Sequence, residues 1–201
     1  MMSTDTQRFK LKTPSRLLNL SFLFFTPLLS QSVLANEFDM RISDDAIHAN
    51  YSVSNDRGNG QFGAGYFYKN EDQAINILNL DLHTKGQTAI ANLPTTVGIG
   101  FQANLFKEDE LKGSAIGIGG SARVNIPESP GLSLETALHY APEVLAFGDS
   151  DEFRRFRLQI NYRIIENADL SLGYRYLNVG IEDADNHTFE SGAFLGVKLS
   201  F

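Results

Sequence analysis

The chain has 201 residues, a formal net charge of −7 and no cysteine. The absence of cysteine excludes a disulfide framework, a thiolate metal site and a cysteine nucleophile. The acidic balance argues against a nucleic-acid-binding protein that relies on a basic surface.

The first 35 residues have the pattern of a cleavable signal peptide. A basic segment precedes an apolar run over residues 17–34, and a small-x-small cleavage site ends at Ala35. Asn19 and Pro27 interrupt the run, which makes a permanent transmembrane helix the weaker interpretation. We therefore expect a signal peptide over residues 1–35 and one mature domain over residues 36–201. That domain holds 13 basic and 23 acidic residues. The basic residues of the signal are Arg8, Lys10, Lys12 and Arg16.

The N-terminal part of the mature domain predicts short strands of imperfect regularity. Apolar residues alternate over 38–42, over 47–53 with opposite parity, and over 62–68 after a turn-like stretch. A further strand over 75–83 changes parity between Ile77 and Leu78, which predicts a β-bulge. The chain has ten strands if 38–43 is a separate strand, and eight if two of these segments merge.

Six later segments show a clear period of two. They cover residues 97–105, 116–126, 132–140, 155–164, 170–176 and 192–201. On one face 28 of 30 residues are apolar and none is charged, whereas on the other 24 of 26 are polar, charged or glycine. No run of 18 apolar residues occurs after the signal, which excludes a spanning helix. The alternation predicts an all-β antiparallel protein.

The direction in which the apolar face points separates two fold classes. A soluble sandwich or lipocalin-like barrel would bury that face and leave a glycine-rich face in water, where glycine weakens strands without need. A transmembrane barrel turns the apolar face to lipid and fills a narrow lumen with polar residues and glycine. Tyr140, Tyr162, Tyr174 and Tyr176 lie toward strand ends on the apolar face, as interfacial girdles do. We therefore expect an antiparallel up-and-down transmembrane β-barrel of eight to ten strands in the bacterial outer membrane.

Loop lengths orient the predicted barrel. Periplasmic turns are short and outer loops longer, so residues 107–112, 141–152 and 182–187 are expected outside, and the turns at 127–131 and 166–168 inside. The chain ends on Phe201, with Leu199, Val197 and Leu195 at two-residue intervals before it. This ending resembles the C-terminal signature of outer-membrane proteins, and these four residues are the expected insertion signal. The expected partners are outer-membrane lipid, lipopolysaccharide and the barrel-assembly machinery.

Three segments resemble the YfaZ family of outer-membrane proteins: residues 60–66, 140–149 and 162–175. The resemblance covers most of the mature chain and is moderately specific. It implies a barrel in the outer membrane, and it brings no catalytic residues or cofactor with it.

The polar face predicts a charged cluster that lines the lumen. Its members are Arg123, Glu135, His139, Arg155, Arg157, Arg163, Arg175 and Lys198, and Asp39 and Asp81 are candidates from the N-terminal strands. Buried charges must be paired or hydrated. A salt-bridged plug in a non-conducting envelope protein is therefore the favoured interpretation, and a narrow anion-preferring pore is the alternative.

Evidence for catalysis or metal binding is weak. Glu135 and His139 face the same way on one strand, yet no nucleophile accompanies them, so a structural hydrogen bond is favoured over a lipid-modifying enzyme. The histidines lack metal-ligand spacing, and no cofactor is expected. The expected outer loops are acidic and could hold Ca²⁺ or Mg²⁺, but simple solvation is favoured. Their acids are Glu108, Asp109, Glu110, Glu143, Asp149, Asp151, Glu152, Glu182, Asp183 and Asp185.

Overall fold

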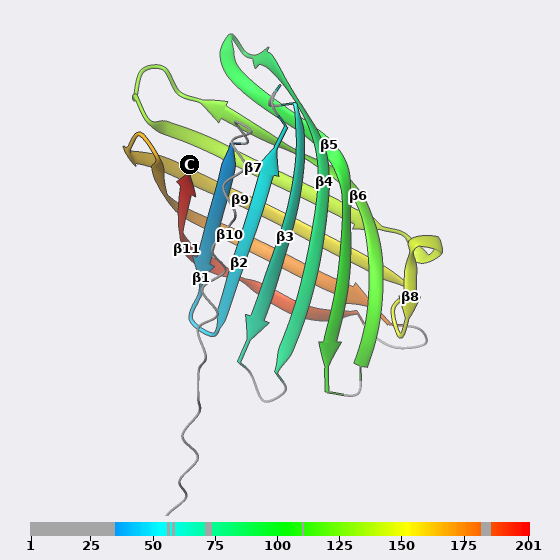
Figure 1. Ribbon diagram of the computed structural model, residues 1–201. Helices are drawn as coiled ribbons and strands as arrows, with labels where there is room; N and C mark the ends of the chain where they lie inside the picture. Colours follow the sequence, from blue (N-terminus) through cyan, green and yellow to red (C-terminus); the bar gives the residue numbers. More distant parts are fainter. Residues whose placement is uncertain (1–34, 56, 58, 71–73, 110, 182–185) are drawn as a thin grey trace, which may run out of the picture. The chain divides into compact units, whose positions relative to one another are not determined.

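A computed structural model describes residues 35–55, 57, 59–70, 74–109, 111–181 and 186–201. These residues form ten long antiparallel strands that close into a barrel (Figure 1). The strands are β1 (Asn36–Ile42), β2 (Ala46–Ser54), β3 (Gly60–Lys69), β4 (Ile75–Ile90), β5 (Leu93–Glu108), β6 (Leu111–Asn125), β7 (Leu132–Ala141), β9 (Glu152–Ile165), β10 (Ala168–Gly180) and β11 (His187–Ser200). A 3₁₀ turn, η1 (Glu143–Leu145), and a short strand, β8 (Ala146–Gly148), lie between β7 and β9.

The barrel closes where the first strand meets the last. β1 pairs with β11 from Glu37 opposite Ser200 to Ile42 opposite Leu195. The backbone amides of Asn36 and Phe201 each donate to the other's carbonyl, at 2.8 and 2.9 Å. Figure 1 shows β1 and β11 side by side. Among the described residues, closure leaves no long edge strand with unpaired backbone groups, which is the condition for a sheet to cross a bilayer.

The two ends of the barrel differ. One end, here called the turn end, carries the two termini of the barrel and its short connections, such as the Ala91–Asn92 turn between β4 and β5. The opposite end, the loop end, carries the connections predicted to lie outside, including η1 and β8. β8 pairs with β6 over Gly113–Ala115 and extends the barrel wall beyond the end of β7. The connections predicted to lie outside share this end, and the predicted turns at 127–131 and 166–168 share the other. Their lengths do not separate as predicted, because the loop-end connection between β5 and β6 covers only residues 109–110, whereas the turn-end connection between β6 and β7 covers residues 126–131.

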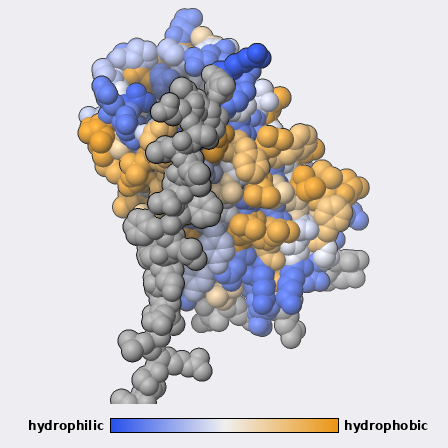
Figure 2. Space-filling model, in the orientation of Figure 1, coloured by the Kyte–Doolittle hydropathy of each residue, from blue (hydrophilic) through white to orange (hydrophobic). Residues whose placement is uncertain are grey.

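The apolar face of the strands points outward. Ile99 is 72% exposed and Leu195 66%, whereas the neighbours Gln102, Asn104 and Arg175 on the alternate face are buried. Figure 2 shows the outward face as orange side chains between more hydrophilic ends. The exposed tyrosines lie on this face: Tyr51, Tyr66, Tyr68, Tyr140, Tyr162 and Tyr174. An exposed apolar belt around a polar interior is the arrangement of a transmembrane barrel.

The N-terminal strands match one expectation and contradict another. β1 is a strand of its own, so the barrel has ten long strands rather than eight. The predicted bulge in β4 is wrong, because Ile77 and Leu78 pair in unbroken register with Phe67 and Tyr66 of β3. Ile75 and Ile77 are apolar because they point into the barrel and are fully buried, while Leu78 points to the outside.

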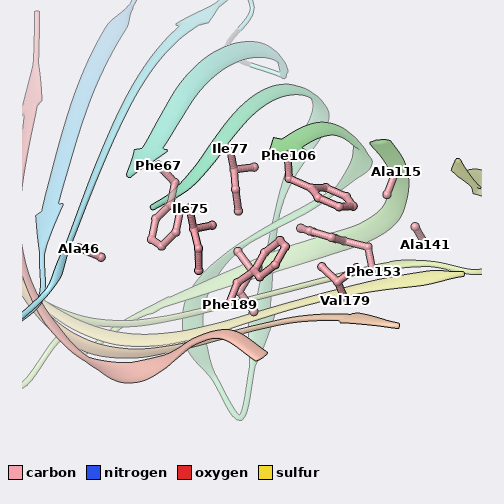
Figure 3. Close-up of a cluster of buried hydrophobic side chains, with 11 residues drawn as sticks. Ala46, Phe67, Ile75, Ile77, Phe106, Ala115, Ala141, Phe153, Val179 and Phe189 are labelled. Atoms are coloured by element: carbon pink, nitrogen blue, oxygen red, sulfur yellow. The ribbon is translucent and has the colours of Figure 1, made fainter. Parts of the chain in front are cut away.

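These two isoleucines belong to an apolar plug that fills the loop end of the lumen. Its members come from nine of the ten long strands, all except β1, and in Figure 3 their labelled side chains point toward one another within the barrel. Phe106 stacks on Phe153 with ring centroids 6.0 Å apart and meets Phe189 edge to face at 5.4 Å. The plug consists of Ala46, Phe67, Ile75, Ile77, Phe106, Ala115, Ala141, Phe153, Leu177, Val179 and Phe189.

Candidate functional site: the polar lumen

Between the plug and the turn end the lumen is polar, and it contains the predicted charged cluster. The side chains of Glu135, His139, Arg155 and Arg175 are buried inside the barrel, whereas Arg163 is largely exposed at the turn end. Every member except Arg123 and Arg163 lines a cavity of about 140 Å³, and these two line a second cavity nearer the turn end. Asp39 and Asp81 also line the first cavity. The function of the cluster stays a prediction.

The most deeply buried ion pair lies next to the plug, on its turn-end side. Nε and Nη2 of Arg175 donate to the two carboxylate oxygens of Glu190, each at 2.7 Å. The guanidinium lies 4.8 Å from the ring centroid of Phe67 and 5.6 Å from that of Phe194. The bidentate geometry and the aromatic faces offset the cost of burying the two charges. Ser43 adds a hydroxyl donor to Glu190 at 3.2 Å.

A chain of hydrogen bonds crosses the lumen from β1 to β9. Nη1 of Arg41 donates to Nδ1 of His48 at 3.1 Å, which leaves Nε2 of that histidine to donate to Asn79 at 3.2 Å. Asn79 donates onward to Asp81 at 2.8 Å, and Gln102 donates to the other carboxylate oxygen. The chain ends where Nη1 of Arg155 donates to Gln102 at 2.9 Å. It ties β1, β2, β4, β5 and β9 together across the interior.

Nearer the turn end, two acidic side chains each bind two bases, and Glu37 accepts from the amide of Gln61 at 3.2 Å. Glu135 accepts from Arg157 at 2.7 Å and from Lys198 at 3.4 Å. Asp169 accepts from Arg123 at 2.7 Å and from Arg163 at 3.3 Å. Two carboxylates therefore compensate four cations. The arrangement leaves positive charge in excess in this part of the lumen.

Two histidines meet across the inner wall above a pair of glycines. His83 of β4 and His139 of β7 are separated in register by Gly100 and Gly119 of β5 and β6. Their Nε2 atoms lie 2.8 Å apart, so one imidazole donates to the other. A Cβ on Gly100 would lie 2.7 Å from the His83 ring, and one on Gly119 would lie 2.8 Å from the His139 ring. The glycines thus provide the space in which the imidazoles meet.

Two adjoining cavities that share lining residues lie in the described part of the lumen and end short of the plug. The first, of about 140 Å³, is surrounded by the hydrogen-bond chain and the histidine pair. The second, of about 300 Å³, lies toward the turn end. Glu37, Lys85, Ser121, Glu135 and Lys198 line both. No residue of the plug lines either cavity, so the polar space faces the turn end and is closed at the loop end.

Comparison with protein families decides the assignment. The family model described as "YfaZ precursor" matches residues 17–201. The chain belongs to the YfaZ family. A closed barrel with an apolar outer belt places this YfaZ protein in the bacterial outer membrane. No curated protein matches the sequence.

Solved structures similar to this YfaZ protein include several outer-membrane proteins. The KdgM porin in complex with disordered oligogalacturonate is 11% identical, with 83% of this chain and 99% of that chain covered and a TM-score of 0.45. Neisserial surface protein A is 13% identical, with 84% and 94% covered and a TM-score of 0.35. The channel DcaP of Acinetobacter baumannii is 12% identical, with 81% and 54% covered and a TM-score of 0.39.

The predicted acid–base pair of this YfaZ protein is divided between two networks. Glu135 binds Arg157 and Lys198, whereas His139 binds His83. In the part of the chain that the structure describes, no three His, Asp or Glu side chains converge to hold a metal ion. No helix among those residues is long and apolar enough to cross a membrane.

The acidic loop residues lie at the loop end, partly beyond what is described. Glu108 accepts from His187 at 2.7 Å, and a carboxylate oxygen of Asp149 accepts from the backbone amide of Lys112 at 2.9 Å. Glu110 and residues 182–185 lie outside the described residues. The four residues of the expected insertion signal end the chain at the turn end. Leu195, Leu199 and Phe201 are exposed on the outer face, and Val197 also points outward. Their role in assembly stays a prediction.

Sequence reasoning missed the plug, the histidine pair and Lys85. The plug was detectable in principle, because Phe67, Phe106 and Phe153 are apolar at positions where the alternation demands polar residues. The histidine pair was not detectable, because it depends on the register of four strands.

Proposed function

We propose that this YfaZ protein is a non-enzymatic, non-conducting outer-membrane barrel with a structural or surface-interaction role in the envelope. The observation that carries the proposal is the apolar plug. Its phenylalanines Phe67, Phe153 and Phe189 are fully buried, and Phe106 nearly so. A dry, packed segment across the lumen offers an ion no polar partner and therefore opposes its passage.

The polar lumen supports the same function. The bidentate pair of Arg175 and Glu190 closes the space beneath the plug, and the hydrogen-bond chain from Arg41 to Arg155 links strands on opposite walls. Hydrogen-bond networks that cross the lumen rigidify a barrel, and here buried nitrogens of Arg41, Arg155 and Arg175 keep no hydrogen-bond partner among the described residues. The loop end offers a surface for contacts, because Val144 is 79% exposed and Phe147 51%. Lipopolysaccharide and outer-membrane lipid are the proposed partners, and the barrel-assembly machinery is the proposed partner during insertion.

Planar-bilayer recording tests the proposal. The mature protein, reconstituted with insertion verified by heat-modifiable mobility, should give no discrete conductance steps at neutral pH. A strain that lacks the protein should lose resistance to detergent or to chelators, and the wild-type gene should restore it. Discrete steps from the purified wild-type barrel would contradict the closed state and favour a pore.

A narrow anion-preferring pore is the second candidate. The cavities toward the turn end favour it, because cations there outnumber acids. Conduction would require Phe106, Phe153 and Phe189 to leave the lumen together. A lipid-modifying enzyme finds less support, because Glu135 and His139 are held by separate partners.

A further inference from the structure

We infer that the vestibule at the turn end is a dead-end binding site for a small soluble anion that carries phosphate or carboxylate groups. The vestibule is the cavity of about 300 Å³ in which Lys85, Arg123, Arg163 and Lys198 face Glu37 and Glu135. The inference rests on the proposed closed barrel, since a ligand that enters from the turn end meets the plug rather than an exit.

The charges of the vestibule do not balance. Lys198 shares the carboxylate of Glu135 with Arg157, and Arg123 shares the single carboxylate of Asp169 with Arg163. The backbone amide of Lys85 donates to the carbonyl of Asn59, but its side-chain ammonium makes no ion pair or hydrogen bond among the described residues and interacts with Glu37 only at longer range. A cation that is already drawn into a low-dielectric pocket gains more from an anionic ligand than from water.

The exposed fraction of the cationic side chains of the vestibule increases from the interior to the entrance. The side chain of Lys198 is 14% exposed, that of Arg123 22% and that of Arg163 55%. Arg163 therefore reaches the water at the entrance, and the other two lie deeper. Walls of low dielectric concentrate the field of such a gradient along the vestibule and raise the local concentration of anions.

The polar lining fits an oxyanion. Guanidinium and ammonium groups donate to phosphate and carboxylate oxygens, and arginine does so with two parallel bonds. Thr96, Ser121 and Asn125 line the same cavity and add neutral donors. A volume of about 300 Å³ admits a small solute such as phosphate or a short polycarboxylate.

Titration with orthophosphate and with citrate tests the inference. The folded mature barrel in zwitterionic detergent should bind at least one of the two anions saturably, with one site per barrel, by calorimetry. Lys85→Gln combined with Arg163→Gln should weaken binding at least tenfold. Both side chains are partly exposed, the Lys85 ammonium makes no ion pair or hydrogen bond among the described residues, and Asp169 keeps Arg123 when Arg163 is replaced, so the double variant should keep its heat-modifiable mobility.

Lys107→Gln is the matched control, because Lys107 is exposed near the loop end of β5. It should bind as the wild type does. A second arm adds micelles that contain phosphatidylglycerol, whose headgroup carries the same chemistry. Absence of saturable binding of either anion, equal weakening by Lys107→Gln, or saturation by the lipid headgroup without competition from free anion would each overturn the inference. Conductance of the wild type would refute the closed barrel independently, because it is measured without these ligands or variants.

Discussion

An arginine placed on the outer face of β9 should reveal whether that face meets lipid. Ile160 is 52% exposed near the middle of the strand, and its register partners Leu134 on β7 and Leu172 on β10 are also exposed. A lipid-facing arginine at the bilayer midplane costs about 2–4 kcal/mol, and near the interface about 0–1 kcal/mol. Ile160→Arg should therefore lower the free energy of unfolding by about 2–4 kcal/mol.

Ile164→Arg on the same strand provides the depth control. Four residues of a strand tilted by about 40° span roughly 10 Å along the membrane normal, and the apolar band of such barrels is about 25 Å tall. Ile164 is 49% exposed, so it presents a similar surface, but it lies close to the edge of the band. Its substitution should cost no more than about 1 kcal/mol.

Urea unfolding in lipid vesicles measures both variants. The chain contains no tryptophan, so loss of the far-ultraviolet circular dichroism of the strands is the signal, with heat-modifiable mobility as a second readout. If the outward face met water, both arginines would change stability by less than about 0.5 kcal/mol. Equal and negligible effects at Ile160 and Ile164 would refute the lipid-facing belt.

Three further perturbations test the interior and the chain end. Arg175→Met should cost about 3–5 kcal/mol in urea unfolding because it strands a buried carboxylate, and adding Glu190→Gln should recover most of the loss. Gly119→Ala should reduce the folded yield in detergent, because its Cβ would lie 2.7 Å from the Cα of the cross-strand histidine, whereas Gly86→Ala meets no atom within 4 Å and should fold normally. Deletion of Phe201 should lower the amount of folded protein in isolated outer membranes, and normal assembly without it would remove its proposed role as an insertion signal.

The sequence was sufficient to predict the barrel fold and which face of each strand points to lipid. The reason is that the side of the sheet to which a residue points depends only on its position within its own strand. A residue's parity determines its side of the sheet, so Arg157 and Gln159 alternate with Leu158 and Ile160 whatever strand lies next to them. A glycine-rich polar face and tyrosines on the apolar face then distinguish a lipid-facing barrel from a water-facing one. Both features can be read within a single segment.

The error at β4 shows where parity fails. Ile75 and Ile77 lie inside and Leu78 outside, so the strand has apolar residues on both faces at its loop end. A single segment cannot distinguish that arrangement from a bulge, because each shifts the apolar positions by one residue. Phe67 on the neighbouring strand supplies the missing information, since it pairs with Ile77 and marks a lumen that is apolar at this level.

The partners within the lumen could not be predicted, because they depend on distances across the barrel. Parity places His83 and His139 inside, yet 56 residues separate them in the chain and only the register of β4 to β7 brings them within 2.8 Å. The isolation of Lys85 has the same origin. Glu135 binds cations of β9 and β11, and Glu37 accepts from Gln61 of β3, which is a property of the closed barrel rather than of any segment.

The interior of the barrel is filled in two ways, by paired charges toward the turn end and by packed phenylalanines at the loop end. Their order along the barrel axis supports the proposal that an anion enters from the turn end. A buried charge is costly unless it is paired, whereas a buried phenylalanine is stable only where water is excluded. The boundary between the two regions is the pair of Arg175 and Glu190. Nε and Nη2 of the arginine bind the two carboxylate oxygens, and Phe67 and Phe194 cover the guanidinium, whose Nη1 has no hydrogen-bond partner among the described residues. Water that enters from the turn end therefore meets a neutralised pair before it meets the plug. The cations that exceed the nearby carboxylates, such as Lys85, lie on the turn-end side of that boundary, where an anion from solution can reach them.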